Sequence, residues 1–378
     1  MLIGVAAESD PHETRVAASA ETVKKFIALG AEVAVERGAG TTAGIPDADF
    51  AAAGAQLVAA AEALGADIVL KVRRPNGEEI GQLKRGALVF ASMDPYGHQD
   101  AIEALAASGA AAFAMELMPR ITRAQSMDVL SSQANLAGYR AVIDAAAEYG
   151  RALPMMMTPA GTVAAAKAFV MGVGVAGLQA IATARRLGAI VTATDVRPAT
   201  KEQVESLGAK FVAVEDEEFK QAETAGGYAK EMSDAYKAKQ AALVAAHIAK
   251  QDIVITTALI PGRAAPRLVT ADMVKTMRAG SVIVDLAVER GGNCELARAG
   301  EIVATDNGVK IVGTSSVTRL AATASALYAR NLYAFIETLI DKSAKAIAVN
   351  WDDELVKATL LTREGAIAHP NFQPKASA

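Results

Sequence analysis

The chain has 378 residues, of which 52% are hydrophobic, 21% are charged and 4% are aromatic, and its formal net charge is −4. This composition is typical of an alanine-rich globular protein of roughly two domains and excludes a disordered chain. The near balance of 38 basic and 42 acidic residues argues against nucleic acid or an anionic membrane surface as a partner.

The sequence also bears on the cellular compartment. Its longest uncharged run, between Lys167 and Arg185, has 17 residues, fewer than the roughly 20 apolar residues of a membrane-spanning helix. The N-terminus has no basic segment followed by an apolar stretch, and Cys294 is the only cysteine, so no internal disulfide can form. These features predict a cytoplasmic protein without direct membrane insertion.

From the first residue, short β-rich runs alternate with helical patterns, which is typical of βα units that build a parallel sheet. The predicted helices cover residues 21–30, 50–65 and 98–109. The predicted strands cover residues 2–8, 31–38, 66–72, 87–93 and 110–117. Together they predict one doubly wound α/β domain.

A run without helix breakers over residues 126–150 predicts a long helix that leaves this domain, and a second long helical run over 317–342 returns to it. Between them, strands are predicted over residues 167–174, 189–195, 210–214, 252–259, 281–288 and 308–314. The predicted fold is α/β, with two doubly wound, Rossmann-like parallel-sheet domains joined by two long helices. Ligands commonly bind in the cleft between such domains.

The predicted boundaries follow from these elements. Residues 1–130 form the N-terminal domain, which residues 320–378 complete, and residues 131–319 form the Rossmann domain. Between the predicted strands 210–214 and 252–259 there are more residues than one crossover helix needs. An insertion of that size is usually functional or disordered.

A glycine motif opens the Rossmann domain. Gly172, Gly174 and Gly177 follow the spacing G-x-G-x-x-G, directly after a predicted strand and at the start of a helix. The first glycine permits a tight turn, the second lets the backbone approach a pyrophosphate, and the third lets helix and strand pack closely.

An acidic residue completes the motif. Asp195 lies 18 residues beyond Gly177, at the end of the next predicted strand. A carboxylate there accepts hydrogen bonds from an adenosine ribose and repels a 2′-phosphate. The motif therefore predicts an NAD(H) site, although the nearby Arg197 weakens the preference over NADP(H) a little.

Several longer stretches carry a resemblance to a known family. They include MELMPRITRAQSMDVLSSQANLAGYRAV (115–142), TDVRPATKEQVESLGAKF (194–211), TAGGYAKEM (224–232), TTALIPGRAAP (256–266) and VDLAVERGGNCE (284–295). With the glycine motif, they closely resemble the NAD(H)-binding alpha subunit of proton-translocating NAD(P) transhydrogenase over essentially the whole chain. This family shares its fold with alanine dehydrogenase.

The resemblance implies a loop that positions the nicotinamide ring. The matching residues are Arg120, Gln125 and Asp128, with Ser131 close behind. Such side chains supply the donor and the acceptor that a carboxamide needs. The alternative is that Arg120 and Asp128 only form a surface ion pair and cap the following helix.

The resemblance also implies a mobile loop around residues 220–235 that closes over NAD(H). Gly227 would serve as a pivot, and Tyr228 and Met232 would supply apolar surface. A solvated acidic loop without a role is the alternative. The predicted cofactor-binding residues are Gly172, Gly174, Val175, Ala176, Gly177, Asp195, Val196, Arg197, Gly227, Tyr228, Met232, Ala258 and Leu259, and no metal site is predicted.

The implied activity is Si-type hydride transfer from NADH to NADP⁺. The NADP(H) would be bound on a partner beta subunit, and membrane-spanning subunits would translocate the proton. Because this sequence ends without a membrane span, it resembles the soluble first subunit of a split form. We therefore expect a homodimer, peripheral on the cytoplasmic face of the inner membrane, whose second domains form much of the contact.

The rival enzyme is alanine dehydrogenase, and the chemistry separates the two. Reduction of pyruvate with ammonia moves a proton as well as a hydride and needs a general acid, whereas transfer between two nicotinamide rings needs only alignment. Alanine dehydrogenase has a histidine just after the strand that matches residues 87–93, where this chain has none; His98 follows a few residues later. Glu289 also replaces an aspartate of that enzyme.

Arg15 and Lys71, in contrast, match residues that bind substrate in alanine dehydrogenases. The transhydrogenase subunits also have these two residues. This chain therefore has part of the substrate site of alanine dehydrogenase but lacks its histidine. A third reading, outside enzymes, is a module that senses NAD and reports its occupancy to a partner.

Overall fold

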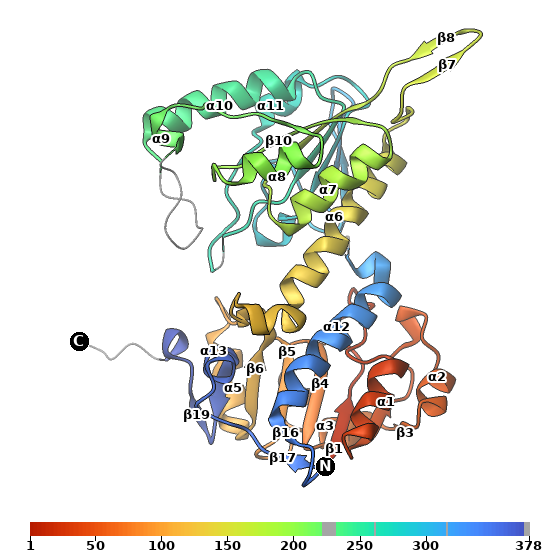
Figure 1. Ribbon diagram of the computed structural model, residues 1–378, viewed down its shortest axis with the longest axis vertical. Helices are drawn as coiled ribbons and strands as arrows, with labels where there is room; N and C mark the ends of the chain where they lie inside the picture. Colours follow the sequence, from red (N-terminus) through yellow and green to blue (C-terminus); the bar gives the residue numbers. More distant parts are fainter. Residues whose placement is uncertain (221–231, 261, 315–316, 374–378) are drawn as a thin grey trace. The chain divides into compact units, whose positions relative to one another are not determined.

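The computed structural model describes residues 1–220, 232–260, 262–314 and 317–373 (Figure 1). Its contacts divide the chain into two compact units, Met1–Gln133 with Thr318–Ala378, and Ala134–Val317. Each unit has its own mainly parallel sheet with helices on both faces. The predicted α/β fold of two parallel-sheet domains is confirmed. None of the described helices is both long and apolar enough to cross a membrane.

The first unit contains an eight-stranded sheet in the order β19-β18-β6-β5-β4-β1-β2-β3. Strands β1 to β6 are parallel, and β18 and β19 extend the sheet in antiparallel pairs. The strands are β1 (Leu2–Val5), β2 (Glu32–Glu36), β3 (Gln56–Val58), β4 (Ile68–Arg73), β5 (Leu88–Ser92), β6 (Ala111–Ala114), β18 (Leu360–Arg363) and β19 (Ala366–Ile367). The helices are α1 (Ala20–Ala28), α2 (Asp47–Ala52), α3 (Ala60–Leu64), α4 (Gly77–Ile80), α5 (Gln99–Ser108), α12 (Ala321–Ile336) and α13 (Glu354–Thr359).

Both faces of this sheet are buried, because its central strands are apolar on both sides. Ile68 and Leu70 of β4 belong to the core under α1, α2 and α12, whereas Val69 belongs to the core under α3 and α5. Such near-continuous apolar strands are typical of parallel sheets covered by helices on both faces. A small antiparallel pair, β16 (Ile340–Asp341) and β17 (Ala346–Ile347), follows α12.

The second unit contains a seven-stranded sheet in the order β11-β10-β9-β12-β13-β15-β14, in which only β14 is antiparallel. The strands are β9 (Lys167–Met171), β10 (Ile190–Thr194), β11 (Lys210–Phe211), β12 (Ile253–Thr256), β13 (Val282–Asp285), β14 (Ile302–Ala304) and β15 (Lys310–Val312). The helices are α6 (Val129–Glu148), whose first residues belong to the first unit, α7 (Val175–Arg186), α8 (Thr200–Ser206), α9 (Glu217–Lys220), α10 (Asp234–Ile248) and α11 (Ala271–Thr276).

The two sheets share one topology. Counted from β1 or from β9, the first five strands lie in the order 3-2-1-4-5. The chain therefore reverses direction across each sheet between β1 and β4, and between β9 and β12. Ligands of doubly wound folds bind at such switch points, beyond the carboxyl ends of the strands.

One predicted element is wrong. The helix predicted over residues 50–65 is interrupted: α2 ends at Ala52, and Gln56–Val58 form β3, which pairs with Ala34–Glu36 of β2. Gly54 adopts a φ of +100°, which ends the helix, and the alanine-rich run around it has no periodicity that would reveal the change. The helix predicted over 317–342 ends at Ile336 and lies in the first unit.

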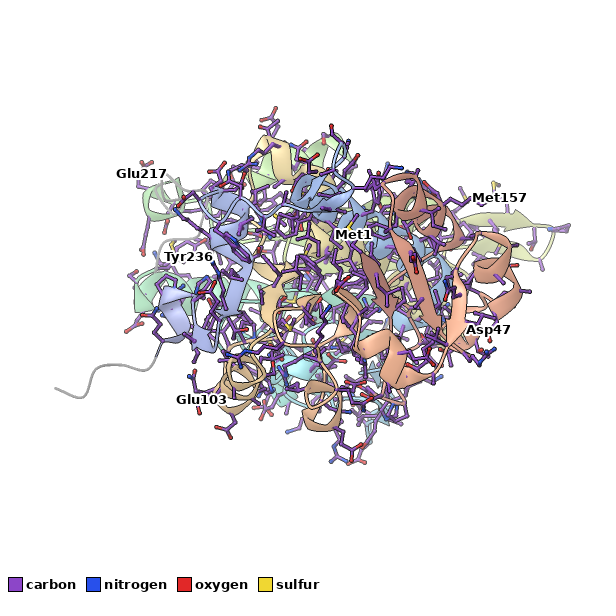
Figure 2. All side chains as sticks on the ribbon, turned by 90° about the horizontal axis from the view of Figure 1, so that it is seen from below. Met1, Asp47, Glu103, Met157, Glu217 and Tyr236 are labelled. Carbon is purple, nitrogen blue, oxygen red and sulfur yellow. The ribbon has the colours of Figure 1, made fainter. Side chains whose placement is uncertain are left out.

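A β-hairpin projects from the second unit. It consists of β7 (Met156–Thr158) and β8 (Gly161–Val163), which pair only with each other (Figure 1). All six strand residues are exposed, and the side chain of Met157 extends outward with 81% of its surface exposed (Figure 2). An isolated two-stranded hairpin is at best marginally stable in water, so packing against another surface would stabilise this one.

Candidate functional site

The glycine motif lies at the switch point of the second sheet. Gly172 follows β9 with a φ of +98°, and a Cβ atom added to Gly177 would lie 1.9 Å from the carbonyl oxygen of Gly172. A Cβ on Gly174, the N-cap of α7, would meet no atom of the described residues within 4 Å. The space in front of this helix N-terminus is therefore open, as the pyrophosphate of a dinucleotide requires.

Asp195 lies beside this loop, just after β10. Its Oδ2 accepts hydrogen bonds from the backbone N–H of Val173 (2.7 Å) and from Nη2 of Arg197 (3.0 Å), and its Oδ1 accepts from Nε of Arg197 (2.9 Å). The carboxylate is thus fixed against the glycine loop, at the end of the second strand, where the motif predicts a ribose acceptor. Since Arg197 already holds both oxygens, ribose hydroxyls must share or displace its hydrogen bonds.

The segment after β12 forms the other side of the switch point. The hydroxyl of Thr257 donates to the carbonyl of Gly172 (3.0 Å), and Ala258 N–H donates to Oδ1 of Asn293 (3.0 Å). Asn293, which is fully buried, returns hydrogen bonds to the carbonyls of Ala258 and Pro266. Asn293 was not among the predicted residues. The two glycines before it, Gly291 and Gly292, indicate a turn in the sequence and could have drawn attention to it.

The remaining cofactor residues of the prediction divide into three groups. Val175, Val196 and Leu259 have exposed side chains around this switch point, where Ala176, in the first turn of α7, is half-buried. Met232 is buried in the core of the second unit, which also contains Phe219 and Tyr236. Gly227 and Tyr228 lie outside the described residues.

The loop predicted to position the nicotinamide belongs to the first unit. Residues Thr122–Met127 form a 3₁₀ helix, in which Ala124 and Met127 are buried. Gln125 lies within this helix, and Asp128 is its C-cap with an extended backbone. Arg120 and Gln125 are exposed and Asp128 is half-buried.

Asp128 fixes the start of α6. Its Oδ1 accepts from the backbone N–H of Ser131 (2.9 Å), and its Oδ2 accepts from the Ser131 hydroxyl (2.5 Å). This is an N-cap interaction, which satisfies one of the helix's unpaired N–H groups. The capping part of the alternative for Asp128 is therefore present, and Gln125 projects beside it on the same turn.

A buried charge cluster occupies the switch point of the first sheet. Glu13 holds one edge of the Arg15 guanidinium, with Nε–Oε1 and Nη2–Oε2 distances of 2.7 and 2.6 Å. The fully buried Nζ of Lys71 lies 2.7 Å from Oε1 of Glu79 and 3.8 Å from Oε2 of Glu8. Both cations that match the substrate site of alanine dehydrogenase are thus neutralised by carboxylates of this chain.

Glu8 makes stability depend on pH. Burial raises the pKa of its carboxyl to about 7, against the lowering effect of Lys71 and of the N–H groups of Val72 and Arg73. A raised carboxyl pKa means that the folded state holds a proton which the unfolded chain releases near pH 4.5. Below pH 4.5, this difference in pKa contributes about 3 kcal/mol to the stability of the folded state. The contribution is lost as the pH rises from 4.5 to about 7.

Glu8→Gln should remove this dependence, because the amide stays neutral. Between pH 5 and pH 8, we expect the parent to lose about 3 kcal/mol of unfolding free energy that the variant does not lose. Urea unfolding at several pH values measures it. Glu78→Gln, at an exposed position of α4, serves as the control. Parallel pH profiles for Glu8→Gln and the parent would refute the assignment.

The histidines are placed as structural or solvent-facing groups. His98 caps α5 with its side chain 42% exposed, and its Nδ1 donates to the carbonyl of Asp94 (2.8 Å). His247 is packed against Phe169 and bonded to the Thr192 hydroxyl, and burial lowers its pKa. His12 is exposed, and Glu289, on the 3₁₀ turn after β13, is exposed as well.

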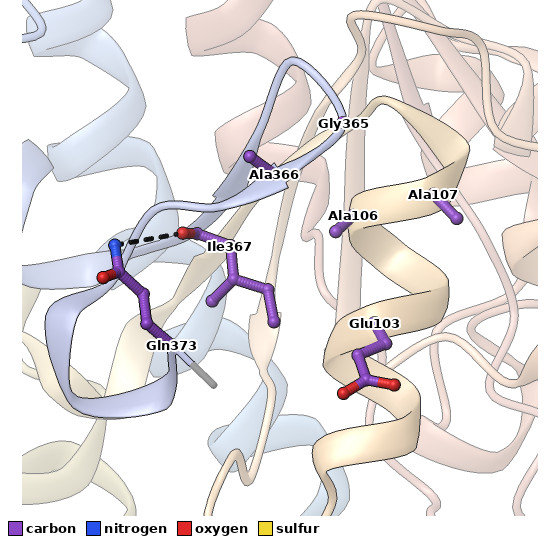
Figure 3. A pocket seen from close by; sticks show the side chains of 7 residues that line it. All are labelled: Glu103, Ala106, Ala107, Gly365, Ala366, Ile367 and Gln373. Atoms are coloured by element: carbon purple, nitrogen blue, oxygen red, sulfur yellow. Dashed lines mark hydrogen bonds between the residues drawn. The ribbon is translucent and has the colours of Figure 1, made fainter. Parts of the chain in front are cut away.

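The hollows of the surface lie elsewhere. One of about 530 Å³ lies between α5 and the end of the chain (Figure 3), and one of about 520 Å³ lies beside the base of the hairpin. None of the predicted site residues lines either hollow. Within the described parts of the chain, no three His, Cys, Asp or Glu side chains gather as a metal site would require.

Comparisons with known proteins place the chain in a family. The models for the N-terminal and C-terminal domains of alanine dehydrogenase/PNT match residues 4–137 and 141–370. The chain is 56% identical to the first of the polypeptides that form NAD(P) transhydrogenase subunit alpha in Rhodospirillum rubrum, over 98% of each chain. It is 32% identical to alanine dehydrogenase of Mycobacterium tuberculosis, over 79% of this chain and 75% of that one.

Solved structures give the same ranking. The chain resembles the transhydrogenase from Sinorhizobium meliloti with a TM-score of 0.89 and 62% identity, over 97% of this chain and 100% of that one. It resembles an L-alanine dehydrogenase with a TM-score of 0.82 and 26% identity, over 98% of both chains. The chain therefore belongs to the alanine dehydrogenase/PNT family and, within it, to the transhydrogenase alpha subunits.

Proposed function

We propose that this chain binds NAD(H) in its second unit and passes hydride between NADH and NADP⁺ bound on a partner subunit. The observation that carries the proposal is the glycine loop beside Asp195 at the switch point of the second sheet, with open space in front of Gly174. Bound NADH would supply the hydride at C4 of its nicotinamide. The chain's own part is to bind the dinucleotide and to align the ring.

The division of labour follows from the residues. The N-terminus of α7 and the backbone of Gly174 would face the pyrophosphate, and Asp195 would accept from the adenosine ribose. Arg120 and Gln125 would hold the carboxamide, and Asp128 would fix their loop through its bonds to Ser131. We retain Si-type transfer from NADH to NADP⁺ as a prediction.

The placement of acid and base groups favours this reaction over that of alanine dehydrogenase. A reductive amination needs a proton donor for the carbonyl oxygen that leaves as water, and cations that bind the substrate. His98 is solvent-exposed and bonded to its own loop, and Arg15 and Lys71 are paired with Glu13 and Glu79. Hydride transfer between two rings requires none of these groups as a proton donor or as a partner of a substrate carboxylate.

Asp195→Asn tests the ribose contact. The substitution keeps the shape of the side chain and removes its charge, so we expect NADH binding to weaken by about 1 to 3 kcal/mol, the range for a hydrogen bond to a charged group. Titration calorimetry measures the dissociation constant. Asp272→Asn, at an exposed position of α11, is the matched control. An unchanged constant for Asp195→Asn would remove this residue from the ribose site.

We also propose a homodimer in which the hairpin β7–β8 covers a second copy. Residues 152–166 carry no charge, and Met155, Met156 and Met157 are all exposed. In a twofold dimer each copy buries the other's hairpin through the same contact. This arrangement would supply the partner surface that the isolated hairpin lacks.

Met157→Asp should therefore dissociate the dimer, since a carboxylate would be buried in an apolar contact. We expect the dissociation constant of the dimer to rise at least about a hundredfold, which corresponds to roughly 2.7 kcal/mol. Sedimentation velocity over a range of concentrations measures it. Ile190→Asp, at another exposed apolar position of the second unit, is the control. A monomeric parent, or equal effects of both substitutions, would contradict the dimer.

The partners complete the proposed enzyme. An NADP(H)-binding beta subunit would receive the hydride, and membrane-spanning subunits would couple the transfer to proton translocation. The chain itself would be peripheral on the cytoplasmic face of the inner membrane.

The direct test mixes the protein with an isolated NADP(H)-binding partner domain and follows hydride transfer to an NAD analogue. Transfer that requires both proteins supports the proposal. A steady rate of NADH oxidation with pyruvate and ammonia alone would identify alanine dehydrogenase instead. Tight NADH binding and complex formation without any hydride transfer would identify an NAD-sensing module.

A further inference from the structure

Asn331, on the buried side of α12, bridges Ser126, which follows Gln125 in the 3₁₀ helix, and Ser132 in the first turn of α6. Its Nδ2 donates to the backbone carbonyl of Ser126 (2.8 Å), and its Oδ1 accepts from the hydroxyl of Ser132 (2.7 Å). Only 7% of its surface is exposed. One side chain therefore clamps the end of the 3₁₀ helix to the start of α6, with Asp128 between the two points of attachment.

The clamp continues into the buried charge cluster. Gln133, one residue after Ser132, accepts from Nη1 of Arg15 (2.8 Å) and donates through Nε2 to the carbonyl of Ala324 on α12 (3.1 Å). Arg15 is in turn fixed by Glu13. A continuous path of hydrogen bonds thus runs from a buried ion pair at the switch point of the first sheet to the loop.

We infer that Asn331 is a positioning residue for hydride transfer, and that Arg15 supports it through Gln133. This inference rests on the proposed function and deepens it. Gln125 lies on a short 3₁₀ helix and Asp128 is its C-cap, and the backbone hydrogen bonds of such a helix alone hold its geometry poorly. The clamp fixes the end of this helix, so that the side chains proposed to align the ring keep one orientation.

Arg15 then has a role that requires no substrate. The residue is 8% exposed, and both edges of its guanidinium are occupied by Glu13 and Gln133. It is therefore built into the scaffold of the loop. This position accounts for the arginine without an amino-acid substrate.

Asn331→Asp is the decisive variant, because it keeps the shape and the acceptor for Ser132 but replaces the donor to Ser126 by an oxygen. We expect hydride transfer at saturating NADH to slow between about tenfold and a hundredfold, since small misplacements of aligning groups have effects of that size. The dissociation constant of NADH should change less than about threefold. Hydrogen exchange should accelerate at the amides of residues 122–128.

A second pair of variants tests the other end of the clamp. Ser132→Ala should slow the transfer in the same way, and Ser132→Thr, which keeps the hydroxyl, should restore it. Asn307→Ala is the matched control: Asn307 holds three backbone carbonyls around α11 in the second unit. It should lower the melting temperature without slowing the transfer.

The outcomes separate this inference from the proposed function. An Asn331→Asp variant with the parent's rate and loop exchange would overturn the inference, as would a loss of NADH affinity in proportion to the rate. If the parent itself transferred no hydride to the partner domain, the proposed function would fail. The loop exchange of Asn331→Asp would then still show whether the clamp holds the loop.

Discussion

Gly177→Ala is expected to destabilise the second unit by roughly 3 kcal/mol or more, because the added methyl group would overlap a backbone carbonyl that cannot move away. The Cβ of such an alanine would lie 1.9 Å from the oxygen and 2.9 Å from the carbon of the Gly172 carbonyl. That carbonyl also accepts from the Thr257 hydroxyl, which ties the glycine loop to the neighbouring strand. Thermal unfolding and NADH titration should both show the loss.

Gly174→Ala is the matched variant, because it separates packing from binding. Among the residues that the structure describes, none has an atom within 4 Å of a Cβ at this position, so the stability of the protein should stay near that of the parent. The same methyl group would project into the space in front of α7, where the pyrophosphate approaches the backbone. We expect NADH affinity to fall between about tenfold and a hundredfold. Parent-like NADH binding in both variants would refute a dinucleotide site at this loop.

The second large effect is expected at the loop of the first unit. Arg120→Ala or Gln125→Asn should slow hydride transfer about a hundredfold, while NADH affinity changes less than about threefold. Both side chains are exposed, so their removal opens no cavity in the core. What they supply is alignment of the ring, and loss of alignment appears in the transfer step rather than in binding.

Single-turnover transfer to the partner domain, together with NADH titration, measures the two quantities separately. Arg37→Ala removes an exposed arginine elsewhere in the first unit and should leave both unchanged. If the affinity for NADH fell in parallel with the rate, the two residues would be binding groups and the positioning role would be wrong.

The fold could be predicted to a large extent, because strands buried on both faces are apolar throughout. β4, β9, β12 and β13 coincide with predicted runs for this reason. The strand β3 could not be predicted, since Gln56–Val58 lie in an alanine-rich run whose helical and strand patterns look alike. The hairpin β7–β8 could not be predicted either. Its two strands have only three residues each, and all of these are exposed, so the sequence shows no alternation of buried and exposed residues.

The site could be predicted where a local motif fixes it. The glycines and Asp195 follow a spacing that a turn and a pyrophosphate impose. Asn293 and Asn331 could not be found in the same way, because each acts across a distance in sequence: Asn331 reaches Ser126, 205 positions earlier. Arg15 and Glu13 are close in sequence, so their ion pair is local. The proposed role of Arg15 depends on its hydrogen bond to Gln133, 118 positions later, which the sequence does not reveal.

The proposed function requires that this chain align NADH for direct transfer of a hydride to a second nicotinamide ring, without exchange with solvent. NADH that carries two deuterium atoms at C4 provides the test, with the NADP(H)-binding partner domain and NADP⁺ in ordinary water. We expect each NADPH formed to contain one deuterium and none to enter the water. Unlabelled NADPH, or labelled alanine formed from pyruvate and ammonia without the partner domain, would contradict this mechanism.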